Sequence, residues 1–211
     1  TTEIYTLSLH DALPISIGQY EMKFHSDLPA TTVRGFRQVN TTSGASKFNY
    51  LGPIIVAQKD RAVRIKYVNE LPIGAEGKLP IPVDTTYMGA EDTENRSSVH
   101  LHGGNTPWIS DGTVRQWVKP VGETGANKGV SVVYVPDMWY DASGNAIPSC
   151  YGSITCAVTG AKNDPGQGRM TFYYTNQETA RLMWYHDHSL GITRLNVYSG
   201  LAAGYLLHDE N

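Results

Sequence analysis

The sequence lacks any apolar run long enough to cross a membrane, and it has no excess of basic residues. No stretch approaches the roughly 18 consecutive apolar residues that a transmembrane helix needs. The 17 lysines and arginines are outnumbered by 20 acidic residues, so the net charge is −3. This balance gives no sign of a nucleic-acid partner or of binding to an anionic membrane. Glycine-rich nucleotide loops, a Gly-x-Ser-x-Gly elbow and solenoid repeats are also absent.

Cysteine is scarce as well, with only Cys150 and Cys156 in the chain. The two residues lie close together in a turn-rich region, where a disulfide would close a small loop and add about 2 kcal/mol of stability. Such a bond would indicate an oxidising compartment. Two free thiols in a loop are the alternative. Neither cysteine has a histidine nearby in the sequence, so we do not expect them to bind a metal.

The start of the chain looks foreign to the rest. Residues 1–15 match, without a mismatch, one reading frame of a widely used DNA-sequencing adapter, and the next adapter base can begin the codon of Ser16. We therefore expect residues 1–16 to be non-native, with no function for His10 or Asp11. A native N-terminal strand is the alternative. On this interpretation the true N-terminus is missing, so the absence of a signal peptide carries no information.

The remaining composition predicts an all-β domain. Removing 16 of the 211 residues leaves 195, the size of one domain over residues 17–211. The chain contains 13 tyrosines, 21 glycines and 11 prolines, which favours short strands joined by turns. A Greek-key β-sandwich or barrel is the expected architecture. Residues 119–168 are expected to form a long loop insertion. The main strands are expected at residues 20–25, 54–58, 62–68, 97–102, 169–175, 181–188 and 200–208, and a further strand is considered at 130–136. Residues 54–58 and 62–68 are expected to pair across a turn at 59–61, with Val63, Ile65 and Tyr67 on one buried face.

Two of these strands carry paired histidines. His100 and His102 are separated by one residue, and so are His186 and His188. Alternate residues of a strand point to the same face, so each pair presents two imidazoles side by side. If the two strands are neighbours, all four rings converge on one patch. Imidazole is a common ligand of copper and zinc, so the sequence predicts a metal site there. Satisfied structural histidines are the alternative, but four of the seven histidines lie in these two short motifs.

The two motifs also carry a family resemblance. Val99–Gly104 and Trp184–His188 resemble the first two copper motifs of the multicopper oxidases. Thr193–Leu201 is similar to the branch that contains the bacterial spore-coat laccases and the bilirubin oxidases. The resemblance covers most of residues 17–211 and is weakest between about 119 and 168. It implies a cupredoxin-like fold, as the first domain of such an oxidase.

The resemblance also implies roles for the histidines. In this family a trinuclear copper cluster lies between the first and last domains, and each domain supplies half of the histidines. His100 would then bind the type 2 copper, His102 and His186 one type 3 copper, and His188 the other. Asp111 lies where family members carry an acidic residue near the cluster, which would deliver protons to reduced oxygen. The alternative for Asp111 is an ordinary Asp-Gly turn.

The same resemblance implies what lies outside this chain. The family's type 1 copper needs a His-Cys-His run, and the sequence contains none. We therefore expect the chain alone to be incomplete as an oxidase and to need the C-terminal cupredoxin domains of the same polypeptide. The complete enzyme would couple oxidation of phenols, aromatic amines or metal ions to the four-electron reduction of O2 to water. Family analogy places it in the bacterial periplasm, the extracellular space or the spore coat.

Other classes remain possible on the sequence. A non-catalytic β-domain that stores or delivers copper or zinc can also be built from four histidines. A cupin also uses His-x-His, but it places a glutamate a few residues later, where this chain has Gly103-Gly104-Asn105-Thr106. Copper nitrite reductases carry a type 1 site with cysteine in their first domain, which disfavours that class.

Overall fold

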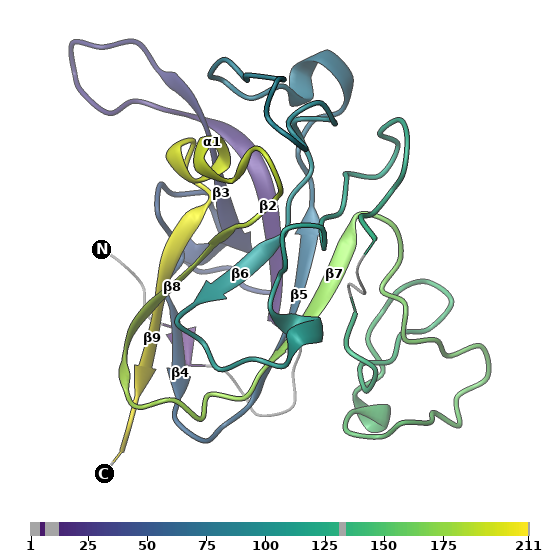
Figure 1. The fold of residues 1–211 in the computed structure, drawn as a ribbon. Helices are drawn as coiled ribbons and strands as arrows, with labels where there is room; N and C mark the ends of the chain where they lie inside the picture. The colour runs from purple at the N-terminus through teal and green to yellow at the C-terminus, as the bar shows by residue number, and fades with distance from the viewer. Residues whose placement is uncertain (1–4, 7–12, 131–133, 211) are drawn as a thin grey trace.

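Two β-sheets form the centre of the protein (Figure 1). The computed structural model describes residues 5–6, 13–130 and 134–210. One sheet has five strands, in the spatial order β1 (Tyr5–Thr6), β4 (Ile55–Gln58), β9 (Ala202–His208), β8 (Arg181–Asp187) and β6 (Val99–His102). The other has four, in the order β3 (Thr31–Gln38), β2 (Leu13–Met22), β5 (Val63–Asn69) and β7 (Arg169–Tyr174). The prediction of an all-β fold is confirmed.

Helical structure is confined to short segments. Among the described residues the one α-helix is α1 (Thr193–Tyr198), which follows the second histidine motif and was not predicted. No helix in the described part of the chain is long and apolar enough to span a bilayer. The remaining helical pieces are single 3-10 turns: η1 (Gly44–Ser46), η2 (Gly74–Gly77), η3 (Trp108–Ser110) and η4 (Pro148–Cys150).

Strands β4 and β5 lie in different sheets, although the sequence predicted them as a pair. Residues 59–61 do form the predicted turn, with Asp60 at a positive φ of 61°. The turn carries the chain across the sandwich, so that β4 pairs with β9 and β5 pairs with β2 and β7. Alternation of apolar residues reveals which face of each strand is buried but not which strand lies beside it. The pairing prediction is therefore wrong, whereas the buried faces are as expected.

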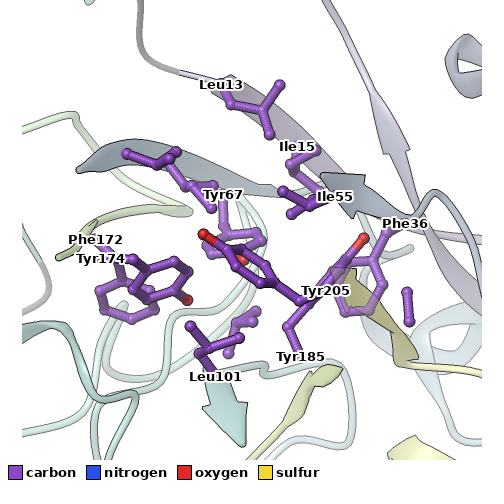
Figure 2. Close-up of a cluster of buried hydrophobic side chains, with 14 of the residues drawn as sticks. Leu13, Ile15, Phe36, Ile55, Tyr67, Leu101, Phe172, Tyr174, Tyr185 and Tyr205 are labelled. Atoms are coloured by element: carbon purple, nitrogen blue, oxygen red, sulfur yellow. The ribbon is translucent and has the colours of Figure 1, made fainter. Parts of the chain in front are cut away.

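The core between the sheets is rich in aromatic rings (Figure 2). Tyr185 of β8 lies 4.8 Å from Phe36 of β3 between ring centroids, and Tyr67 of β5 lies 5.8 Å from Phe172 of β7. Large buried rings dominate core energetics, and a tyrosine also needs a partner for its hydroxyl. The hydroxyl of Tyr185 donates to the backbone oxygen of Pro53 at 2.7 Å. This layer is what holds β8 in place and, with it, the second histidine motif.

Residues 13–16, which we expected to be non-native, form the start of β2. Leu13 pairs with Ile65 and Ile15 with Tyr67 in parallel register, and both side chains are buried. Alternating apolar residues favour a strand whatever their coding origin, and the open edge of β5 accepts one here. His10 and Asp11 lie outside the described residues. The adapter origin of residues 1–16 stays a prediction, and resequencing the gene from its source tests it.

The insertion at 119–168 folds against the outside of the four-stranded sheet. Val135, Met138 and Tyr140 make a small apolar cluster of their own. Lys66 of β5 lies 5.0 Å above the ring of Tyr140, which joins the insertion to the sandwich. Val130, Tyr134, Val135 and Pro136 are not in a strand, and residues 131–133 of the strand considered there lie outside the described residues. Cys150 and Cys156 form a disulfide.

Candidate metal centre

Strands β6 and β8 are neighbours, which brings the two histidine motifs together. The strands are antiparallel, with His100 opposite His186 and His102 opposite Trp184. His188 lies just beyond the end of β8, and its backbone N–H donates to the oxygen of Ser98 at 2.8 Å. The two motifs therefore meet edge to edge.

The alternation of each strand decides which way the histidines point. Val99 and Leu101 on β6, and Tyr185 on β8, are at most 1% exposed in the core. Because successive strand residues face opposite sides, the histidines between them point to the outer face of the five-stranded sheet. The apolar residues of the motifs thus orient the polar ones.

The four imidazole rings form one cluster. His100 and His188 are stacked, with centroids 4.7 Å apart and planes 21° from parallel. His186 lies 5.4 Å from His102, 5.5 Å from His100 and 5.8 Å from His188. The structure therefore brings together all four histidines that the sequence singled out.

Backbone carbonyls fix the ring orientation of three of these histidines. The Nδ1 atoms of His100, His186 and His188 lie 2.6, 2.7 and 2.8 Å from the oxygens of Asp111, Asp187 and Gly112. A carbonyl oxygen only accepts, so each Nδ1 carries the proton and donates it. Each Nε2 is then left with its lone pair, which is the form that binds a metal. In His102 it is Nδ1 that lies 3.3 Å from the Nε2 of His186.

Burial keeps two of the rings neutral. It lowers the pKa of His186 to about 4 from its usual 6.5, because the surrounding protein disfavours the imidazolium. Burial also lowers the pKa of His100. Both rings are therefore uncharged at neutral pH, as metal ligation requires.

The donor set fits a copper or zinc ion. The ligand atoms of His100, His102 and His186 all lie within 4.8 Å of one another. Metal–imidazole bonds are about 2.0–2.1 Å long, so two ligands of one ion stand at most about 4.2 Å apart. The bound of 4.8 Å is close to that limit. His188 stands outside this group of three, stacked on His100.

Asp111 is at once a turn residue and a neighbour of the cluster. Its backbone oxygen holds His100, while its carboxylate Oδ1 lies 3.5 Å from the Nδ1 of that ring. Oδ1 also accepts a hydrogen bond from the hydroxyl of Thr106 at 3.0 Å. The next residue, Gly112, has a φ of +66°, which favours glycine. The two interpretations made from the sequence are therefore compatible.

Trp184 is a contributor that sequence reasoning did not single out. Its ring stacks on His186 at 4.2 Å and on His102 at 4.9 Å. It is the outward-pointing residue two before His186, so its place on the histidine face follows from strand alternation. The Trp184 ring therefore covers one face of each of these two imidazoles and limits their rotation.

Asp187 is a second residue that the sequence analysis passed over. It sits between His186 and His188 but points inward and is fully buried. Burial raises the pKa of its carboxyl, although hydrogen bonds from Ser97 and Ser189 oppose that shift. A charged residue at an inward position of a strand was the available signal. The other described histidines, His25 beside Asp27 and His208 at the end of β9, lie outside the cluster.

Sequence comparison finds relatives among copper oxidases. A laccase from Bacillus stratosphericus is 32% identical over 197 residues, covering 92% of this chain and 28% of the relative. A laccase from Bacillus subtilis (strain 168) is 29% identical over 191 residues, covering 89% and 27%. Multicopper oxidase LPR1 of Arabidopsis thaliana is 27% identical over 198 residues. The chain spans about a quarter of the length of these relatives. No family model matches the chain.

Solved structures give the same fold. The 2F4 variant of the McoA multicopper oxidase from Aquifex aeolicus superposes with a TM-score of 0.57 at 16% identity, covering 98% of this chain and 28% of that one. A multicopper oxidase from Pediococcus acidilactici gives 0.51 at 17% identity, covering 93% and 25%. The fold is therefore that of a cupredoxin-like domain. With the sequence relatives, this identifies the chain as a cupredoxin-like domain of the multicopper oxidase family.

Proposed function

We propose that this chain supplies half of the histidines that hold a trinuclear copper cluster in a multicopper oxidase. The observation that carries the proposal is the cluster of four imidazoles, three of them with Nδ1 engaged and Nε2 left as a donor. Family resemblance assigns His100 to the type 2 copper, His102 and His186 to one type 3 copper, and His188 to the other. Neighbouring rings lie 4.7 to 5.8 Å apart between centroids, which supports a cluster of several ions bordered by all four.

The proposed reaction is oxidation of a small reductant coupled to reduction of O2 to water. Copper held by imidazoles alternates between two oxidation states, and a group of such ions can deliver the four electrons that O2 needs. Phenols, aromatic amines or metal ions are the proposed reductants. His100 and His186 stay neutral because burial lowers their pKa, and backbone oxygens hold their Nδ1–H groups, while Trp184 stacks on His102 and His186. The remaining ligands and the type 1 site would come from further domains of the same polypeptide.

The test is to titrate Cu(II) into the chain, and then to assay oxidation of a phenolic dye. We expect copper to bind, because the imidazole donors are clustered, and we expect no turnover, because the sequence lacks a His-Cys-His run. Metal analysis and electron paramagnetic resonance give the stoichiometry and the ligands. Failure to bind copper, or turnover by the chain alone, contradicts the proposal. Uptake of Zn(II) in preference to Cu(II) supports instead a domain for metal storage or delivery.

Asp111 is proposed as the proton donor to reduced oxygen. Its carboxylate lies beside His100 and remains partly open, with 37% of the side chain exposed. Positioned acids contribute about 100-fold to 10,000-fold to a rate. In the complete oxidase, Asp111→Asn is expected to lower kcat at least about 100-fold with copper content unchanged. A variant that keeps both its copper and its kcat would rule out this role.

We also propose that the protein is exported. The disulfide between Cys150 and Cys156 is the supporting observation, because such bonds persist mainly in oxidising compartments. Fractionation of the source cells, with detection of the protein in the cytoplasm alone, would contradict this.

A further inference from the structure

Asp187 lies between two candidate ligands but faces away from them. Its side chain is fully buried, on the side of β8 opposite to His186 and His188. Two donors reach its Oδ1 from the chain leading into β6: the hydroxyl of Ser97 at 2.9 Å and the backbone N–H of Ser98 at 3.2 Å. Ser189 gives two more, from its hydroxyl to Oδ1 at 3.0 Å and from its backbone N–H to Oδ2 at 3.0 Å. The side chain of Asn196 also hydrogen-bonds this carboxylate.

The four hydrogen bonds from Ser97, Ser98 and Ser189 link the segment just before β6 to the segment just after His188. Ser97 and Ser98 immediately precede β6, and Ser189 immediately follows His188. The ladder between β6 and β8 ends at the pair of Val99 and Asp187, so His188 lies beyond it. The place of His188 relative to His100 therefore depends on the Asp187 carboxylate and on the bond from its own N–H to Ser98.

Two buried arginines give this carboxylate a second function as a counter-charge. Arg34 and Arg96 are each at most 1% exposed. Their guanidinium groups donate mainly to backbone oxygens, including Gly77 for Arg34 and Leu190 for Arg96. The charge of Asp187 raises the pKa of both arginines, against the lowering effect of burial. A neutral side chain at position 187 would leave two buried cations without that compensation.

We propose that Asp187 is a positioning residue that sets the relative placement of the two histidine pairs, and hence the geometry in which they hold metal. This proposal rests on the proposed function only for metal binding, since the imidazole rings have their relative positions without metal. A residue that merely stabilised the domain would change the unfolding free energy and leave the folded imidazoles as they are.

The sharpest variant is Asp187→Asn, which keeps the size of the side chain and exchanges one acceptor for a donor. Oδ1 faces the N–H of Ser98 and Oδ2 faces the N–H of Ser189. A backbone N–H cannot reverse its direction, so either orientation of the amide sets an NH2 group against a donor. The Asn side chain therefore loses the hydrogen bond from Ser98 or the one from Ser189, whichever way the amide turns.

The test has two readouts on the full 211-residue chain. The first is the ring 15N spectrum without metal, which distinguishes Nδ1–H from Nε2–H in each imidazole. We expect His186 and His188 to be Nδ1–H in the wild type and to become mixed in Asp187→Asn. The second is Cu(II) affinity, measured by competition with a coloured chelator. Loss of an outer partner of metal ligands costs about 10-fold to 100-fold in affinity, and we expect a loss of that size.

Two further variants keep the result interpretable. Ser97→Ala removes the hydrogen bond from the Ser97 hydroxyl and is expected to cause a smaller change of the same kind. This variant tests the proposal if Asp187→Asn does not fold. Tyr205→Phe is the matched control, because it removes a buried hydrogen bond to Asn176 inside the core. It is expected to lower stability and leave both readouts unchanged.

The outcomes separate the two proposals. Wild-type ring spectra and wild-type affinity in folded Asp187→Asn or Ser97→Ala would overturn the positioning role. An equal effect of Tyr205→Phe would overturn it too, since stability alone would then explain the change. A wild-type chain that binds no copper would contradict the proposed function, and the metal-free spectra would still decide the role of Asp187.

Discussion

Replacing His186 by alanine is expected to lower the affinity of the chain for Cu(II) more than about 100-fold, because losing even an outer partner of a ligand costs up to about that much. His186 lies at the centre of the cluster, within 5.8 Å of each of the other three rings between centroids. Its Nε2 also lies 3.3 Å from the Nδ1 of His102, so its removal affects two donors. Chelator competition followed by electron paramagnetic resonance measures the loss.

The controls for this experiment are the other described histidines. His208 ends β9, at the opposite end of that strand from Ala202, the partner of His186, and His25 is on a surface turn. Alanine at either position removes an imidazole from the chain without touching the cluster. Affinity is expected to stay within about 2-fold of the wild type in both, a change worth about 0.4 kcal/mol. If His208→Ala or His25→Ala matches His186→Ala, copper binds elsewhere.

Gly112→Ala is the change with the largest expected effect on stability. A Cβ at this position would lie 1.7 Å from the backbone oxygen of Val99, and the residue also has a φ of +66°. Backbone cannot yield as a flexible side chain does, so the turn must move. Backbone strain alone costs about 1–3 kcal/mol, and with the clash we expect a loss of about 3 kcal/mol or more in unfolding free energy. Denaturation in urea measures it.

Gly152→Ala separates the two causes. Gly152 has a φ of +77°, but a Cβ there would meet nothing within 4 Å. Its substitution therefore reports the cost of the positive φ alone, expected at about 1–2 kcal/mol. Gly112 also supplies the oxygen that holds His188, so Gly112→Ala should disturb metal binding while Gly152→Ala should not. Equal losses of stability in the two variants would show that the contact with Val99 is unimportant.

Local patterns in the sequence were enough to predict most of the strands and the faces they bury, although β3 was missed and β2 begins and ends earlier than predicted. Val63, Ile65 and Tyr67 alternate with polar neighbours and are buried as that alternation requires. The same rule placed His100, His102 and His186 on one face of two strands. That β6 and β8 are adjacent was only a condition of the predicted metal site, because periodicity contains no information about neighbours.

The parts that sequence reasoning missed depend on contacts between distant residues. The buried state of Asp187 follows from donors about 90 positions away, at Ser97 and Ser98. The separation of β4 from β5 depends on β9, which comes last in the chain. Helix α1 is only six residues long and has no side-chain cap, so it carries little local signal. Such features require knowledge of the tertiary arrangement.

The turn at Asp111 and Gly112 has a further consequence for how this domain can meet another. Strand β6 is the last strand of its sheet, and an exposed last strand invites pairing with foreign chains. Gly112 packs directly against the outward backbone oxygen of Val99, and Val118 pairs with Ser97 on the same strand's approach. That border is therefore occupied by the chain itself. Pairing of a foreign strand with this part of β6 is therefore blocked, which leaves the outer face of the sheet, with the imidazoles, as the surface open to a neighbour.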